Sequence, residues 1–284
     1  MDTGVLRDFH RVQTLRLNLV LLLPKQDLFK LRGRHQQLPQ LVDSQGARAR
    51  PAWLTVPSEA GNSGKEVHHE EDDMEAPEAP EAETLKKFGL TEGSSNKHLG
   101  QGTENRRFFF KNSFIELIFL NNPEESSSDL IKPTLLFERL SAKDNIASPF
   151  GICFRPKNKD DNGAKFPHWV YKPSYLPASL EVNVAKDSVV SEPMWFFLSF
   201  ASRPDLAAKE KQQPLLHSKD LSEITAIKVS IPNLEQHPTS LLFNTLDSFE
   251  VTDGSEHLME ISFDHEPQGM IHDFRPELPL IFKY

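Results

Sequence analysis

Two apolar segments, each with one central glutamate, constrain the fold of this chain most. Residues 113–119 (SFIELIF) align with residues 257–263 (HLMEISF), and each segment follows a helix-forming stretch, a strand-forming stretch and a turn. Because side chains alternate along a strand, Glu116 and Glu260 take matching positions in the two segments. The repeat predicts two related modules that present two carboxylates to a shared interior.

An acidic stretch divides the chain. Residues 66–83 hold nine acidic residues with no lysine or arginine and repeat the tripeptide Ala-Pro-Glu, a composition that cannot bury much surface. We therefore expect residues 1–65, including a leucine-rich patch at 15–23, to be poorly ordered with at most one short helix, and residues 66–79 to be an acidic linker. Pro80 suits the start of a short helix that ends at Gly89. Residues 80–284 should form the folded domain, with a first module at about 80–160 and a second at about 220–284.

The composition excludes several classes of protein. Acidic residues number 41 and basic residues 32, and outside the acidic stretch the two balance, so the basic surplus of a nucleic-acid-binding protein is lacking. No apolar run is longer than that of residues 19–23, far short of the roughly 18 residues of a membrane span. A single cysteine, Cys153, cannot form an internal disulfide. We expect no nucleic acid, no membrane and a reducing, cytoplasmic location.

The remaining pattern is α+β, with more strand than helix. Residues 106–120 are aromatic and β-branched, which predicts a hairpin that turns at 111–112. The turn at 253–254 predicts a second hairpin, made of residues 249–251 and 257–263. Further strands are predicted at 150–154, 180–184, 195–200 and 224–231, and a helix at 240–246.

A carboxylate inside an apolar strand is costly unless it is paired, hydrogen-bonded or bound to a metal. In the predicted first hairpin, Glu116 lies opposite Arg107, and Ile118 lies opposite Asn105. Glu116 is therefore either a partner in a structural ion pair or a ligand of a metal or substrate. The same two interpretations hold for Glu260.

Other candidate residues also have two interpretations. Asn105 and Arg107 either bind a polar substrate or brace the hairpin. Trp195 belongs to an aromatic set that either lines an apolar pocket or packs in the core. His272 either binds an anionic group of the substrate or anchors the C-terminal tail, and His98 is expected on a surface loop. The aromatic set consists of Trp169, Tyr171, Tyr175, Trp195 and Phe196.

Six motifs occur in order along the C-terminal part of the chain. They are FGLTEG (88–93), HLGQGTENRRFFF (98–110), FIEL (114–117), SPFGICFRP (148–156), SEPMWF (191–196) and HDFRP (272–276). Together they resemble glyoxalase-like proteins of the vicinal oxygen chelate superfamily. The resemblance covers about residues 79–284 and does not specify a reaction.

The resemblance implies paired βαβββ modules in a half-open barrel of the glyoxalase, bleomycin-resistance and dioxygenase type, often around a divalent metal. Glu116 and Glu260 match the strand-end glutamates of this plan, which makes them the metal ligands and catalytic groups. Further ligands come from the opening strand of each module. No strand pattern lies directly before Pro80, so the first module is incomplete, and the second opening strand, 224–229, has no histidine or carboxylate.

The missing first strand leaves a neighbouring strand with an unpaired edge. Three alternatives follow. Residues 15–23 replace the strand, or a partner chain supplies it in a homodimer, or residues 1–78 are an atypical start and the chain is a shortened family member.

The leading hypothesis for function is a metal-dependent enzyme of lyase, isomerase or dioxygenase type that acts on a small oxygenated molecule. The resemblance implies Lewis-acid polarisation of substrate oxygens, with Glu116 or Glu260 as ligand or proton shuttle. The sequence does not distinguish Mg, Mn, Zn, Fe or Ni. The alternatives are a non-catalytic small-molecule-binding protein of the same fold, which the missing ligands favour, and a truncated family member that acts through protein association.

Overall fold

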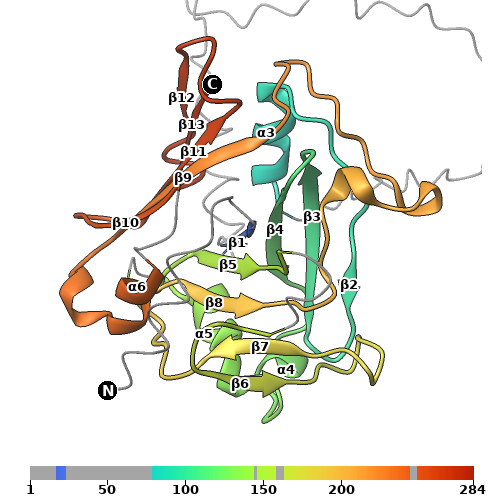
Figure 1. Ribbon diagram of the computed structural model, residues 1–284. Helices are drawn as coiled ribbons and strands as arrows, with labels where there is room; N and C mark the ends of the chain where they lie inside the picture. Colours follow the sequence, from blue (N-terminus) through green and yellow to red (C-terminus); the bar gives the residue numbers. More distant parts are fainter. Residues whose placement is uncertain (1–16, 24–78, 144–145, 158–162, 244–247) are drawn as a thin grey trace, which may run out of the picture. The chain divides into compact units, whose positions relative to one another are not determined.

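The computed structural model describes residues 17–23, 79–143, 146–157, 163–243 and 248–284 (Figure 1). One sheet contains β1 (Leu17–Leu23), β2 (Lys97–His98), β3 (Thr103–Phe109), β4 (Phe114–Leu120), β5 (Phe150–Phe154), β6 (His168–Tyr171), β7 (Val182–Ala185) and β8 (Met194–Phe197). A second contains β9 (Ile224–Ile231), β10 (Phe249–Asp253), β11 (Leu258–Phe263), β12 (Ile271–Asp273) and β13 (Leu280–Lys283). The helices are α3 (Glu81–Phe88), α4 (Pro123–Ser126), α5 (Leu136–Ser141) and α6 (Pro238–Phe243), with 3-10 turns η1 (Lys132–Thr134), η2 (Pro204–Leu206), η3 (Lys209–Lys211) and η4 (Leu234–Gln236). The predicted α+β class, with more strand than helix, is confirmed.

The eight-stranded sheet consists of two halves with the same strand order (Figure 1). From the junction outward, one half runs β1, β4, β3, β2 and the other runs β5, β8, β7, β6. In each half the first pair of strands is parallel and the next two pairs are antiparallel. The halves join through the antiparallel pair β1–β5, and the sheet curls into a half-barrel.

The central position in this sheet belongs to β1, which comes from the leucine-rich patch. Leu19 pairs with Ile115 on one side and with Ile152 on the other. Leu19, Leu21 and Leu22 are fully buried, although they point to both faces, as is typical of a strand covered on both sides. Strand β1 of the same chain therefore takes the place of the first strand, which the sequence analysis expects to be missing. The prediction of poor order is wrong for residues 17–23, while the rest of 1–65 and residues 66–78 lie outside the described residues.

The first helix and the first hairpin form as predicted. Helix α3 follows Pro80 and buries Ala82 and Leu85 completely. It ends at Gly89, whose φ of 124° is favourable for glycine and whose N–H donates to two carbonyls of the last turn. Strands β3 and β4 pair in the expected register, with Arg107 opposite Glu116.

The five-stranded sheet, of order β10-β9-β11-β13-β12, differs from the prediction. Strands β10 and β11 do not form a hairpin, because β9 lies between them, parallel to β10 and antiparallel to β11. The helix α6 connects β9 to β10, which is the kind of crossover that parallel pairing requires. The strands that repeat the order of the first half are thus β5 to β8, within residues 150–197, and not those of residues 220–284.

The five-stranded sheet covers one face of the half-barrel sheet. A large apolar core joins the two, with Leu21, Leu117 and Trp195 from one sheet and Ile227 and Phe282 from the other. The opposite face of the half-barrel carries a smaller apolar cluster, which includes residues of β1, β4 and β8. Among the described helices, none has the length and apolar character needed to cross a membrane.

Replacing Leu21 with alanine should destabilise the protein by about 2–5 kcal/mol, because a fully buried leucine in the central strand leaves a cavity between the sheets. Urea denaturation followed by circular dichroism measures this difference. The control is Leu216→Ala, since Leu216 is 86% exposed and its loss should change the free energy of unfolding by less than about 0.5 kcal/mol. Equal stability of the two variants would show that β1 is not part of the cooperative core.

Candidate functional site

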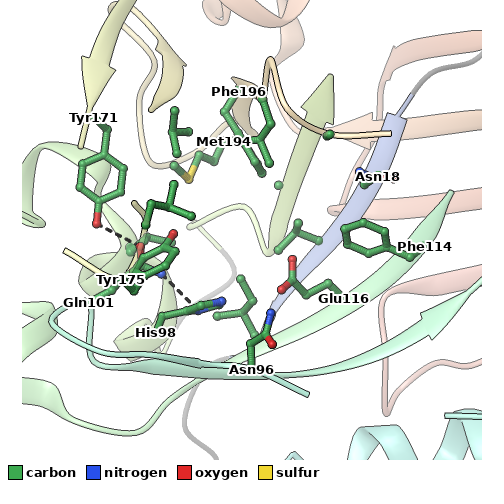
Figure 2. Close-up of a pocket in the computed structure, with 18 of the residues that line it drawn as sticks. Asn18, Asn96, His98, Gln101, Phe114, Glu116, Tyr171, Tyr175, Met194 and Phe196 are labelled. Carbon is green, nitrogen blue, oxygen red and sulfur yellow. Dashed lines mark hydrogen bonds between the residues drawn. The ribbon is translucent and has the colours of Figure 1, made fainter. Parts of the chain in front are cut away.

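A cavity of about 310 Å³ lies on the face of the half-barrel that the five-stranded sheet leaves uncovered (Figure 2). Strands of both halves line it, and the residues 198–202 after β8 contribute to its wall. Its apolar wall contains Val20, Leu22, Ile118, Met194 and Phe196. Apolar walls with a few polar groups are typical of a small-molecule site.

Strand periodicity explains which side chains reach the cavity. Every second residue of β1 points into it, starting at Asn18, while the alternate leucines pack in the core. The same rule brings Phe114, Glu116 and Ile118 to the cavity from β4. On the corresponding strand of the other half, β8, the cavity-facing residues are Met194 and Phe196, both apolar. Among the described residues that line the cavity, only one half therefore contributes a carboxylate.

Glu116 is the carboxylate of this cavity. The side-chain amide of Asn105 donates a hydrogen bond to its Oε1 atom. Burial raises the pKa of Glu116, and the positive charge of Arg107 and the bond from Asn105 offset this only in part. Glu116 therefore keeps its proton to a higher pH than an exposed carboxyl group does.

Arg107 faces Glu116 across the hairpin, yet the predicted ion pair does not form directly. Its Nε donates to the Ser94 carbonyl at 2.8 Å and its Nη2 to Ser94 Oγ at 3.0 Å. With the Asn96 amide oriented to satisfy both of its ends, Nη1 donates to the Asn96 oxygen at 3.2 Å. The guanidinium group thus braces the loop before β3 and acts on Glu116 through its charge.

A hydrogen-bonded chain of side chains continues from Glu116 along the cavity floor. Asn105 Nδ2 lies 3.3 Å from His98 Nε2, and His98 Nδ1 lies 2.9 Å from Thr103 Oγ1. Gln101 Nε2 donates to the same Thr103 oxygen at 2.9 Å, and the Tyr171 hydroxyl donates to Gln101 Oε1 at 3.1 Å. This chain fixes the rotamers around Glu116.

His98 is buried in this chain and is not the surface residue that was expected. It is 9% exposed, and its ring lies against Tyr175 with centroids 4.8 Å apart (Figure 2). Burial, and to a lesser degree the charge of Arg107, lower the pKa of His98 to about 4. The ring is therefore neutral at physiological pH. Because Asn105 donates to Nε2, the proton belongs on Nδ1, which donates to Thr103.

Asn18 is a site residue that the sequence prediction missed. It is 1% exposed, lines the cavity, and its Oδ1 atom has no hydrogen-bond partner among the described residues. A buried carbonyl oxygen without a partner carries a desolvation cost of about 1–3 kcal/mol. The one indication in the sequence is that Asn18 is the only polar residue between Leu17 and Leu23. In the adjacent strand, Cys153 pairs with Asn18, and burial raises the pKa of its thiol.

Glu260 does not lie beside Glu116. It borders a second cavity of about 310 Å³, on the five-stranded sheet, where it forms an ion pair with Lys283 at 2.5 Å. The shared interior predicted for the two glutamates is absent from the described structure, because their strands belong to different sheets. Of the two interpretations of Glu260, the structure has the ion pair, with Lys283 as the partner.

Trp195 and His272 also lie away from the cavity. Trp195 is fully buried on the opposite face of β8, where it stacks on Phe243 with centroids 4.3 Å apart. His272 packs on Phe88 and Phe274 with centroids 4.7 and 4.5 Å apart, so its geometry is that of a tail anchor. Of the aromatic set, Tyr171, Tyr175 and Phe196 line the cavity. For Asn105 and Arg107, the contacts are those that brace the hairpin.

The donors present do not fit the divalent metal that the resemblance implies. Among the described residues, no group of three or more His, Cys, Asp or Glu side chains converges on one point. In the cavity, Glu116 lacks a second carboxylate, and both ring nitrogens of His98 already have neighbours within hydrogen-bond distance.

Comparison with known proteins gives a partial similarity to a solved structure and no named function. No protein-family model matches the sequence, and no curated protein matches it. Among solved structures, the chain is similar to the crystal structure of a hypothetical protein from Staphylococcus aureus. The TM-score is 0.43 at 13% identity, over 67% of this chain and 88% of the other.

The raised pKa of Glu116 gives its contribution to stability a defined pH dependence. As the pH rises, the carboxyl group ionises in the unfolded chain before it ionises in the folded protein. The contribution of Glu116 to the free energy of unfolding is therefore fully favourable below the pKa of the unfolded chain, and it is lost as the pH rises through the pKa of the folded protein. Urea denaturation from about pH 4 to about pH 8 should therefore show Glu116→Gln gaining stability relative to the unmodified protein.

The matched control is Glu260→Gln, which removes the equivalent carboxyl group on β11. Parallel stability curves for Glu116→Gln and the unmodified protein would contradict a raised pKa of this partly buried carboxyl group.

Proposed function

We propose that the protein binds a small organic molecule in the half-barrel cavity, with Glu116 as the polar anchor. The carrying observation is the combination of apolar walls with the buried Asn18 oxygen, which has no partner among the described residues. An apolar cavity of about 150 Å³ holds benzene, so a cavity of about 310 Å³ has room for a fused bicyclic molecule. This is the non-catalytic binding function that the sequence left as an alternative.

The glyoxalase-like resemblance gains support from one part of the structure. The chain order of β1, α3, β2, β3 and β4 is βαβββ, and the same strand pairing recurs in β5 to β8. We infer a half-open barrel of this superfamily that retains the cavity. Among the described residues, no group of three or more metal-ligating side chains converges in it, which favours the binding function over a metal-dependent lyase, isomerase or dioxygenase.

A panel of bicyclic probes tests the binding function. Indole, 2-naphthol and 2-naphthoate are titrated into the full-length protein by isothermal calorimetry, and at least one should bind saturably at one site. Leu176→Trp fills the cavity from a loop and should abolish that binding. Leu216→Trp adds the same bulk at an exposed leucine and should leave it unchanged. If no probe binds, or if Leu176→Trp binds as well as the unmodified protein, the proposal fails.

A second candidate function is proton transfer by Glu116. It is favoured by the raised pKa of Glu116 and by the absence of a described hydrogen-bond partner at its second carboxylate oxygen. Such a carboxylate can remove a proton from the carbon beside a bound carbonyl group and return one to the resulting enolate.

Deuterium exchange in D₂O measures this activity directly. The methyl protons of 2-acetylnaphthalene should exchange faster with the protein than without it, and Glu116→Gln should lose this acceleration. The Glu260→Gln variant should retain it, since Glu260 is paired with Lys283 on the other sheet. Exchange that does not depend on Glu116 would eliminate the catalytic candidate and leave the binding function standing.

A further inference from the structure

The hydroxyl group of Tyr175 is an unused hydrogen-bond donor in the half-barrel cavity. Tyr175 lines the cavity, is half-buried, and its hydroxyl makes no hydrogen bond to any described residue. Unlike Asn18 Oδ1, the hydroxyl oxygen is not one of the buried, closed-off atoms without a partner, so a ligand in the cavity can reach it. The second tyrosine of the cavity differs, because the Tyr171 hydroxyl already donates to Gln101 Oε1 at 3.1 Å.

Arg107 adds two further donors to the lining of the cavity. A guanidinium group has five N–H groups. Three of them donate, Nε to the Ser94 carbonyl, Nη2 to Ser94 Oγ and Nη1 to the reoriented Asn96 amide. One N–H on each terminal nitrogen therefore has no acceptor among the described residues.

The Tyr175 hydroxyl and the Glu116 carboxyl group lie close enough to interact. The ring of Tyr175 packs on His98 with centroids 4.8 Å apart, and His98 connects through Asn105 to Glu116 (Figure 2). Burial, and to a lesser degree Tyr171 and Glu116, raise the pKa of Tyr175, so its hydroxyl keeps its proton at neutral pH. Glu116 Oε2, which has no described partner, accepts a hydrogen bond when ionised and donates one when protonated.

The unused groups of the cavity are thus mainly donors, and they match an oxygen that accepts. A ketone or carboxylate oxygen accepts a hydrogen bond without bringing a hydrogen that needs an acceptor of its own. In a cavity with mainly apolar walls, such an oxygen requires a donor, because a buried polar atom without a partner is costly.

Resting on the proposed function, we infer that the ligand has an apolar body and a carbonyl-type oxygen, from a ketone or a carboxylate, that accepts a hydrogen bond from the Tyr175 hydroxyl. Tyr175 is then a second polar anchor beside Glu116. The body of the ligand lies against Met194 and Phe196, which belong to the apolar wall of the same cavity.

Three naphthalene derivatives test this inference with the full-length protein. The probes are the ketone 2-acetylnaphthalene, the anion 2-naphthoate and 2-isopropenylnaphthalene, in which a CH₂ group replaces the ketone oxygen. Equilibrium dialysis at low probe concentration measures each affinity for the unmodified protein and for Tyr175→Phe, which removes only the hydroxyl.

Tyr175→Phe should weaken the binding of at least one oxygen-bearing probe by about fivefold or more relative to 2-isopropenylnaphthalene, because only the oxygen loses a hydrogen bond. The probe that responds identifies the source of the oxygen as a ketone or a carboxylate. Since the hydroxyl has no described partner in the free protein, its removal should leave the midpoint of urea denaturation unchanged.

The matched control is Tyr284→Phe, which removes a hydroxyl from a residue that packs on Phe88 and does not line the cavity. It should leave all three affinities unchanged. A relative loss below about fivefold for both oxygen-bearing probes in Tyr175→Phe, or an equal loss in Tyr284→Phe, would overturn the inference and leave the binding function intact. If none of the three probes binds to the unmodified protein, the proposed function itself fails.

Discussion

The insertion of β1 between β4 and β5 is the interaction on which the rest of the structure depends. Without this strand the two halves of the half-barrel would have no common partner, because β1 supplies both the parallel contact to β4 and the antiparallel contact to β5. The two faces of β1 have different roles. Leu19 and Leu21 complete the core against the five-stranded sheet, while Asn18, Val20 and Leu22 form part of the cavity wall.

The predictions that succeeded were local. The helix after Pro80 and the register that places Arg107 opposite Glu116 both follow from residues within about a dozen positions of each other. The repeat was assigned to the wrong segment for a physical reason. β8 has only four residues and faces the cavity with apolar side chains, so no glutamate marked it as the counterpart of β4.

The site was predictable only in part, because burial decides which of several polar residues belong to it. Glu116 was recognisable as a carboxylate in an apolar strand. Asn18 was hidden in a segment assigned to a poorly ordered region, and His98 in a glycine-rich loop gave no sign of burial. The tertiary structure brings these two residues to the same cavity. Contacts between residues about 80–100 positions apart leave no local pattern in a single sequence from which they could be predicted.

The asymmetry between the two halves links the fold to the chemistry of the cavity. In two halves with the same strand order, a glutamate on both β4 and β8 would give paired carboxylates that suit a divalent cation. Here β8 contributes Met194 and Phe196 to the cavity, and β4 contributes a single glutamate whose charge Arg107 balances. Among the described residues, Glu116 is thus the single carboxylate in a cavity with mainly apolar walls, and the pair of carboxylates that would suit a divalent cation does not form there.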